Sequence, residues 1–299
     1  MPQSSPHALR GYALALVAGV SWAGAGLIST WMRLDPMVVT GARTLSAALI
    51  LGLGLLIFNR RGFKVSTSPR SLGFLLVYGA LVTAGMQFTY FSSIKANGAA
   101  LGTLLKYLSP VFLLVLGALF FKRRIRILTA TAAAVALFGQ ALAIGLFSGA
   151  GLALTRAGLI WGVCNAVFFT LYTVMGEVGN DHYQSFSLLF YGLAIAAVLW
   201  LIVLGPVRVI TPFLQVKPLL QLLLLASAST ILPFSAYLVS MRSIDSAHAS
   251  IAAMLEPVAA GVGGFLFFRQ PLTVVLLAGG ALSLGAIAIM RLSDIRQAC

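Results

Sequence analysis

Three ionisable side chains lie well inside long apolar stretches of the chain: Arg43, Lys106 and Glu256. A charged side chain at the centre of a bilayer costs about 2.5–3.5 kcal/mol on insertion scales, so each of the three requires a partner or a function. Glu256 is the deepest, roughly ten residues or ~14 Å from the nearer end of its stretch at the helical rise. Lys106 and Arg43 lie about 10 Å from the opposite end of theirs. These depths allow an ion pair between the carboxylate and either cation.

Two interpretations of these charges follow. Glu256 is either a proton-binding carboxylate or partner for a substrate ammonium, or it forms a buried structural pair with Lys106 or Arg43. We expect Lys106, one turn before a proline, to line a cavity or to bind a carboxylate. Arg43 is expected to be structural or to extend towards the outer surface, as long basic side chains readily do.

Two prolines interrupt apolar stretches near their centres. Pro110 removes the backbone donor that the carbonyl of Lys106 would use, and Pro257 does the same to Ala253. Freed carbonyls in mid-membrane are tolerated where they are buried in protein or face a wet cavity. The two interruptions therefore predict a binding region with Pro110 and Pro257 near its hinges; the alternative is a packing kink without a ligand.

The stretches that carry these residues are long enough to cross a bilayer. Sixty per cent of the residues are hydrophobic, nine per cent are charged, and the mean hydropathy is +1.01. A hydrocarbon core of ~30 Å needs about twenty apolar residues. Ten such segments predict an all-α integral membrane protein: 11–32, 37–58, 71–94, 99–121, 127–147, 157–175, 185–204, 218–241, 247–268 and 272–290.

The ten segments fall into two related halves. A constant offset of 147 residues pairs Tyr90 with Tyr237 and the Pro-Val step at Pro110 with that at Pro257. We therefore predict two five-helix repeats, residues 10–147 and 157–292. A repeat with an odd number of spans enters the membrane in the opposite direction the second time, which gives inverted topology and a central cavity near the midplane. Such a molecule can open to either side, as a transporter working by alternating access does.

The loop charges predict the orientation. With a cytoplasmic N-terminus, basic residues favour the inside, as the positive-inside rule requires. The inside carries Arg10, Arg60, Arg61, Lys64, Arg70, Lys122, Arg123, Arg124, Arg126, Arg242, Arg291 and Arg296, and the outside carries Arg33, Lys95, Arg156, Arg208, Lys217 and Arg269. We expect both termini to be cytoplasmic. The formal charge of +14 is thus explained by topology and anionic lipid, and no nucleic-acid motif accompanies it.

The layout and the segments Ser109-Pro110-Val111 and Glu256-Pro257-Val258 resemble the EamA-type family of the drug/metabolite transporter superfamily. Members carry a Pro-Val step in the fourth and ninth helices, and the nearest type is the YddG-like amino-acid exporter. The resemblance implies a ten-helix carrier in a bacterial inner membrane that moves amino acids or similar metabolites outward. One departure is that Lys122 and Arg269 stand near positions where family members commonly have glutamate.

In that family, the first, third, sixth and eighth helices face the central cavity. The resemblance therefore implies a substrate site that includes Lys106 and Glu256 together with aromatic and amide side chains from these helices: Trp22, Gln87, Tyr90, Trp161, Asn165, Tyr172 and Tyr237. Trp31 and Trp200 stand at segment ends and are expected to be interfacial anchors.

Other functions leave signatures that this sequence lacks. The three histidines, His7, His182 and His248, lie outside or near the ends of the apolar segments, and no aspartate lies within one. An intramembrane enzyme is therefore not expected, nor is a metal or cofactor. A passive facilitator or channel for small solutes and an exporter of other metabolites or drugs remain as alternatives. Glycines such as Gly279 and Gly285 fit either internal packing or a dimer face, so monomer and homodimer both stay open.

Overall fold

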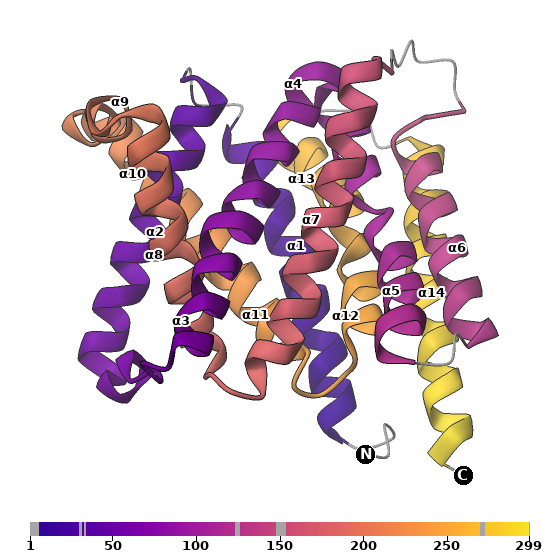
Figure 1. The fold of residues 1–299 in the computed structure, drawn as a ribbon. Coiled ribbons are helices and arrows are strands. Elements are labelled where there is room, and N and C mark those ends of the chain that lie inside the picture. Colours follow the sequence, from indigo (N-terminus) through magenta and orange to yellow (C-terminus); the bar gives the residue numbers. More distant parts are fainter. Residues whose placement is uncertain are drawn as a thin grey trace.

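The computed structural model describes residues 6–29, 32, 34–122, 126–147, 154–269 and 273–298, and these residues form a bundle of helices without strands (Figure 1). The first half contains α1 (Pro6–Ser29), α2 (Pro36–Phe58), η1 (Arg60–Phe63), α3 (Pro69–Leu76), η2 (Val77–Thr83), α4 (Ala84–Lys106), α5 (Ser109–Phe121) and α6 (Ile127–Ala143). The second half contains α7 (Arg156–Asn180), α8 (Ser185–Leu204), α9 (Pro206–Ile210), η3 (Thr211–Leu214), α10 (Val216–Ala226), η4 (Ser227–Ile231), α11 (Leu232–Ser240), α12 (Ser246–Ala252), η5 (Ala253–Leu255), α13 (Glu256–Phe268) and α14 (Val274–Ala298).

The described helices include eight that are long and apolar enough to cross a membrane and two shorter apolar ones, Ile127–Ala143 and Val274–Met290. The expectation of an all-helical membrane protein is thereby confirmed. Large apolar side chains cover the outer surface of the bundle, for example Phe58, Leu119 and Ile202. In water such a surface would be unfavourable, whereas lipid tails solvate it.

Helix α4 contains a reversal of the chain. A methyl group placed on Gly102 would lie 3.0 Å from Cα of Ile94. In a straight helix, eight residues would separate the two positions by ~12 Å along the axis. The backbone therefore turns back between them, and α4 contributes to two membrane-spanning segments, which end at Asn97 and begin at Leu101.

The backbone repeats its irregular features at the same offset as the sequence. Lys122 and Arg269, 147 positions apart, are the described non-glycine residues with positive φ, at 52° and 55°, and each ends a helix in the left-handed conformation. The π-helical segments η2 and η4 also fall at nearly equivalent places, before α4 and α11. Pro110 and Pro257 are each the second residue of a helix, α5 and α13, that starts directly after a break.

The main contacts between helices of the first half and helices of the second half each have an equivalent contact between the counterparts of those helices. Helix α1 packs against α11, and its counterpart α7 packs against α4. Likewise α1 packs against α13, and α7 packs against α5. The counterparts α2 and α8 contact each other, as do α6 and α14. The start of α1 and the end of α14 lie at the same end of the bundle (Figure 1).

Gly279 of α14 serves internal packing, whereas a methyl group on Gly285 would meet nothing within 4 Å. A methyl group on Gly139 of α6 would lie 2.7 Å from the carbonyl oxygen of Gly279, so the two backbones approach as closely as glycine permits. Next to this contact, Gln140 donates hydrogen bonds to the Ser283 hydroxyl at 2.7 Å and to the Met254 carbonyl. The α6–α14 pair thereby supports the backbone at the η5 break.

Candidate functional site

The two proline breaks create helix ends in the middle of the bundle, and these ends carry the two paired charges. Lys106 lies in the last turn of α4, and Glu256 is the first residue of α13. A helix C-terminus favours a cation and an N-terminus favours an anion, because the backbone dipoles sum along the axis. Both charges therefore occupy the helix end that stabilises them.

Lys106 and Glu256 form a buried ion pair. The Lys106 ammonium Nζ lies 2.6 Å from Glu256 Oε2. The hydroxyl of Tyr107 donates to the same oxygen at 2.8 Å. All three side chains are buried. Of the sequence-based alternatives for a partner of Glu256, the structure selects Lys106 over Arg43.

Aromatic rings surround the Lys106 ammonium. Its Nζ lies 4.9 Å from the ring centroid of Tyr107, 5.4 Å from those of Trp22 and Tyr90, and 5.8 Å from that of Phe169. Each ring face attracts a cation through its quadrupole. The ammonium is thus held both by a carboxylate and by an aromatic cage.

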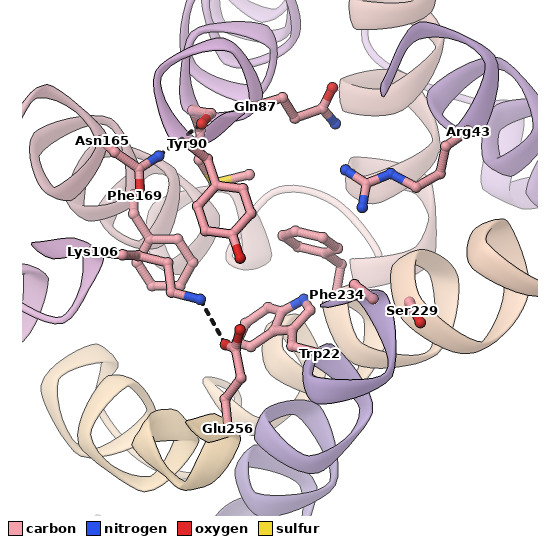
Figure 2. Close-up of a pocket in the computed structure, with 12 residues that line it drawn as sticks. Trp22, Arg43, Gln87, Tyr90, Lys106, Asn165, Phe169, Ser229, Phe234 and Glu256 are labelled. Atoms are coloured by element: carbon pink, nitrogen blue, oxygen red, sulfur yellow. Dashed lines mark hydrogen bonds and ion pairs between the residues drawn. The ribbon is translucent and has the colours of Figure 1, made fainter. Parts of the chain in front are cut away.

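A cavity of about 480 Å³, including its open part, adjoins this ion pair (Figure 2). Half of the lining residues are aromatic or aliphatic, and polar groups from both halves project into the cavity. The lining residues are Trp22, Ala25, Arg43, Met86, Gln87, Tyr90, Lys106, Asn165, Phe169, Ser229, Phe234 and Glu256.

Arg43 projects into the cavity. Figure 2 shows its guanidinium pointing inward from the side opposite Lys106. The side chain is 8% exposed, and its Cζ lies 5.5 Å from the ring centroid of Phe91. The expectation that Arg43 extends to the outer surface is wrong, because its face of α2 is turned towards the bundle axis.

Amide side chains of the lining are held by second partners. Gln87 Oε1 accepts from the Thr44 hydroxyl at 2.9 Å and from Trp200 Nε1 at 3.0 Å. Asn165 Nδ2 donates to the carbonyl of Met86 at 2.7 Å. Trp200 is therefore a buried structural residue and not an interfacial anchor, while Trp31 lies outside the described residues.

The sequence matches a known family twice. The profile of the "EamA-like transporter family" matches residues 9–145 and 156–292. The second match begins and ends 147 positions after the first, which is the offset seen in the sequence and in the backbone. The chain belongs to the EamA-like transporter family. It is a membrane transporter built from two EamA repeats and not an enzyme.

Relatives of this EamA-like transporter carry names of the same kind. It is 25% identical to the "Uncharacterized inner membrane transporter YicL" of Salmonella typhimurium over 97% of each chain. It is 26% identical to an "Uncharacterized transporter" of Archaeoglobus fulgidus, over 75% of this chain and 77% of that one. A solved crystal structure, 18% identical, superposes with a TM-score of 0.79 and covers 96% of this chain and 98% of its own. That likeness establishes the fold alone.

Six of the nine side chains expected at the substrate site of this EamA-like protein line the cavity: Trp22, Gln87, Tyr90, Lys106, Asn165 and Glu256. Tyr172 and Tyr237 lie next to it, where they pack against Phe234 and Trp22 with ring centroids 5.4 Å apart in each pair. Trp161 packs edge to face against Phe88, at 5.3 Å.

Other lining residues of the EamA-like repeats were not foreseen from the sequence. Phe169 and Phe234 stand 147 positions after Trp22 and Gln87, so the offset applied to those two side chains would have found them. The same offset applied backwards from Tyr172 leads to Ala25, whereas Met86 and Ser229 carry no such signal. Within the described residues, no group of three or more His, Cys, Asp or Glu side chains could hold a metal ion.

One end of the EamA-like bundle is closed by two layers. The first layer, next to the cavity, consists of Tyr78 of η2, Tyr172 of α7 and Tyr237 of α11, all fully buried. The rings of Tyr78 and Tyr172 stack with centroids 5.2 Å apart. Beyond them, Arg242 donates to the Ser185 hydroxyl and the Tyr183 carbonyl, both at 2.8 Å. Aromatic and polar contacts thus separate the cavity from this end.

Proposed function

We propose that this protein is a secondary transporter that exports amino acids or similar small metabolites by alternating access around the central cavity. The observation that carries the proposal is that equivalent positions of both repeats line one cavity, Trp22 with Phe169 and Gln87 with Phe234. Both proline breaks lie beside the same cavity, because Lys106, four residues before Pro110, and Glu256, directly before Pro257, line it. A site shared between two repeats is the arrangement from which alternating-access carriers work.

We propose further that the repeats, residues 10–147 and 157–292, each cross the membrane five times and have inverted topology. The exchanged contacts, α1 on α11 against α7 on α4, support a pseudo-twofold relation between them. An odd number of spans in each repeat requires that relation to be inverted. The two shorter apolar helices would be the fifth span of each repeat.

The placement in the membrane is part of the same proposal. We assign both termini to the cytoplasmic side of a bacterial inner membrane. The common end of α1 and α14 in the bundle supports a shared side for the termini (Figure 1). At the same end, Asn59 next to η1 donates to Gln184 and Ser71 bonds to Tyr183, beside the partners of Arg242. Their chain neighbours Arg60, Arg61 and Arg70 therefore lie at the end closed by Arg242, as the positive-inside rule expects for the cytoplasmic face.

Opening of the cytoplasmic end would then follow from movement of one repeat against the other. Pro110 and Pro257 lie in the first turns of α5 and α13, at backbone breaks where the chain bends at low cost because the i to i−4 ladder is already interrupted. The contacts of Arg242 would break on opening. Of the nine side chains named above as the substrate site, the six in the lining would contact the solute directly and Tyr172 and Tyr237 would bound it from the closed side, whereas Trp161 packs against Phe88 outside the lining.

The test is uptake by proteoliposomes across a panel of amino acids, nucleosides and cationic drugs, with and without a pH gradient. We expect saturable flux of neutral or aromatic amino acids and no flux through protein-free liposomes. Leu119→Ala, on the lipid-facing surface of α5, is the matched variant and should transport normally. If nucleosides or drugs move and no amino acid does, the substrate assignment is wrong; if nothing moves, the transporter proposal itself is contradicted for these solutes.

A further inference from the structure

The cavity contains a cation without an anion. Lys106 and Glu256 neutralise each other, whereas the Arg43 guanidinium has no ion pair within the part of the chain that the structure describes. Among the described residues, the ring of Phe91 interacts with this charge, with its centroid 5.5 Å from Arg43 Cζ. A ring quadrupole only partly replaces hydration, so a buried guanidinium of this kind is unfavourable until an anion joins it.

Unpaired hydrogen-bond donors share this cavity with Arg43. Arg43 Nε, Trp22 Nε1 and the Ser229 hydroxyl are buried and have no hydrogen-bond partner among the described residues. All three belong to the cavity lining (Figure 2). Buried polar groups in folded proteins are almost always paired, so orphaned donors that face a cavity indicate that a ligand with acceptor atoms completes them.

We propose that the transported solute carries a carboxylate, which binds at Arg43 with the Trp22 indole as a second donor, and an apolar body that packs against Phe169 and Phe234. This inference rests on the proposed function and names the substrate class of its site. A carboxylate has one negative charge and two acceptor oxygens, which match a planar guanidinium. A phosphate monoester would bring about −1.5 to −2 charges at neutral pH, more than the one that the cavity lacks.

The site does not select for an amino group. The Lys106 ammonium already occupies the aromatic cage formed by Trp22, Tyr90, Tyr107 and Phe169, and it already pairs with Glu256. A solute ammonium would have to displace it. Amino acids therefore bind through their carboxylate, and monocarboxylates that lack an amino group bind as well or better.

Three probes with the same apolar body test this directly: 3-phenylpropionate, L-phenylalanine and phenethylamine, which differ in whether a carboxylate, an amino group or both are present. Dissociation constants are measured by calorimetry on the full chain purified in detergent. We expect both carboxylates to bind, and phenethylamine to bind at least about tenfold more weakly, as loss of a charged hydrogen bond implies.

The variants locate the effect. Arg43→Gln should weaken the binding of both carboxylates by at least about tenfold and leave the dissociation constant of phenethylamine unchanged. Arg43→Lys should fall between, since it keeps the charge without the planar fork. Arg208→Gln, an exposed arginine of α9, is the matched control and should bind as the unaltered protein does. If Arg43→Gln does not fold, Arg43→Lys and the three-probe comparison on the unaltered chain decide the question.

The inference is overturned if phenethylamine binds as tightly as 3-phenylpropionate, if neither carboxylate binds, or if Arg43→Gln has unchanged dissociation constants for the carboxylates. Its failure can be told apart from failure of the proposed function. Carboxylate binding without flux in proteoliposomes contradicts transport and leaves the inference standing. Flux of amines that lack a carboxylate, together with full transport activity of Arg43→Gln, contradicts the inference and leaves the transport proposal standing.

Discussion

The rings of Trp22 and Phe169 contact each other edge to face, with centroids 5.8 Å apart, and the two residues are separated by the repeat offset of 147 positions. Equivalent residues of two repeats can meet only close to the axis that relates the repeats. The ring pair therefore marks the centre of the molecule, and both rings line the cavity. Substitutions here change the place at which the repeats meet.

Trp22→Ala and Phe169→Ala should each lower the kcat/KM of solute uptake by about tenfold or more, because an aromatic pair contributes ~0.5–1.5 kcal/mol beyond the area it buries and the lining wall is also lost. Initial uptake rates in proteoliposomes measure this. Leu119→Ala, which removes a side chain that is 70% exposed on the lipid side, is the control. Equal rates for all three variants would contradict a central role for the ring pair.

The ion pair of Lys106 and Glu256 should show strong coupling. Lys106→Met or Glu256→Gln alone leaves an uncompensated buried charge and should destabilise the protein by about 3–5 kcal/mol. The double variant removes both charges and should recover most of that loss. Thermal unfolding of the purified chain in detergent gives the double-mutant cycle. Additive losses would mean that the two side chains do not stabilise each other.

Transport by the same variants separates a structural pair from a functional one. The double variant retains the packing of the pair without its charges, so a purely structural pair predicts normal uptake at every pH. A functional Glu256 predicts that Glu256→Gln and the double variant both alter the rate or its pH dependence. Uptake measured across a pH series in proteoliposomes distinguishes the two, with protein-free liposomes as the background.

The proline breaks should matter for rate more than for stability. Pro110→Ala and Pro257→Ala permit one more backbone hydrogen bond in each helix, so unfolding temperature should be unchanged or higher. Uptake should slow about tenfold, because a continuous helix bends less easily at that point. Slower transport together with a lower unfolding temperature would instead indicate general damage, and unchanged transport would remove the prolines from the mechanism.

Arg242→Ala should shift the molecule towards opening at the cytoplasmic end. The substitution removes the hydrogen bonds to Ser185 and Tyr183, each of which contributes at most ~1.5–3 kcal/mol net because Arg242 is exposed to water. In a Cys164→Ser and Cys299→Ser background, Thr173→Cys reports access from that side by its rate of maleimide labelling. We expect labelling to rise about fivefold or more. Arg60→Ala is the matched control, and a similar rise there would contradict a specific latch at Arg242.

Much of the fold was predictable because its signals are one-dimensional. Apolar length defines a spanning helix, and a constant offset defines a repeat, so the helices around Pro110 and Pro257 were anticipated to within a few residues. The irregular segments η2 and η4 were not. A π-helical turn depends on how neighbouring helices pack against it. Within the two segments, the hydroxyls of Thr83 and Thr230 each donate to a carbonyl five residues earlier.

The sequence predicted the depth of the site residues along their helices better than it predicted the direction in which their side chains point. The depths of Lys106 and Glu256 allowed their pairing, and the pairing is found. Arg43 lies at a similar depth, yet depth along a helix does not say which face meets the cavity. For that reason the second of the two expectations for Arg43, extension to the outer surface, was wrong. Trp200 shows the same limit: its place near a helix end suggested the interface, while its rotation about the helix axis turns it inward to Gln87.

Counterflow distinguishes a carrier that alternates access from a passive pore. Proteoliposomes are loaded with unlabelled L-phenylalanine, and labelled L-phenylalanine is supplied outside at trace concentration. A carrier that alternates access accumulates label transiently above its final level, because each outward step with unlabelled solute is followed by an inward step with label. Alternating access predicts this overshoot, and it predicts that the overshoot disappears when the proteoliposomes contain no phenylalanine. Label that equilibrates at the same rate with or without the internal solute would contradict alternating access and favour a passive pore.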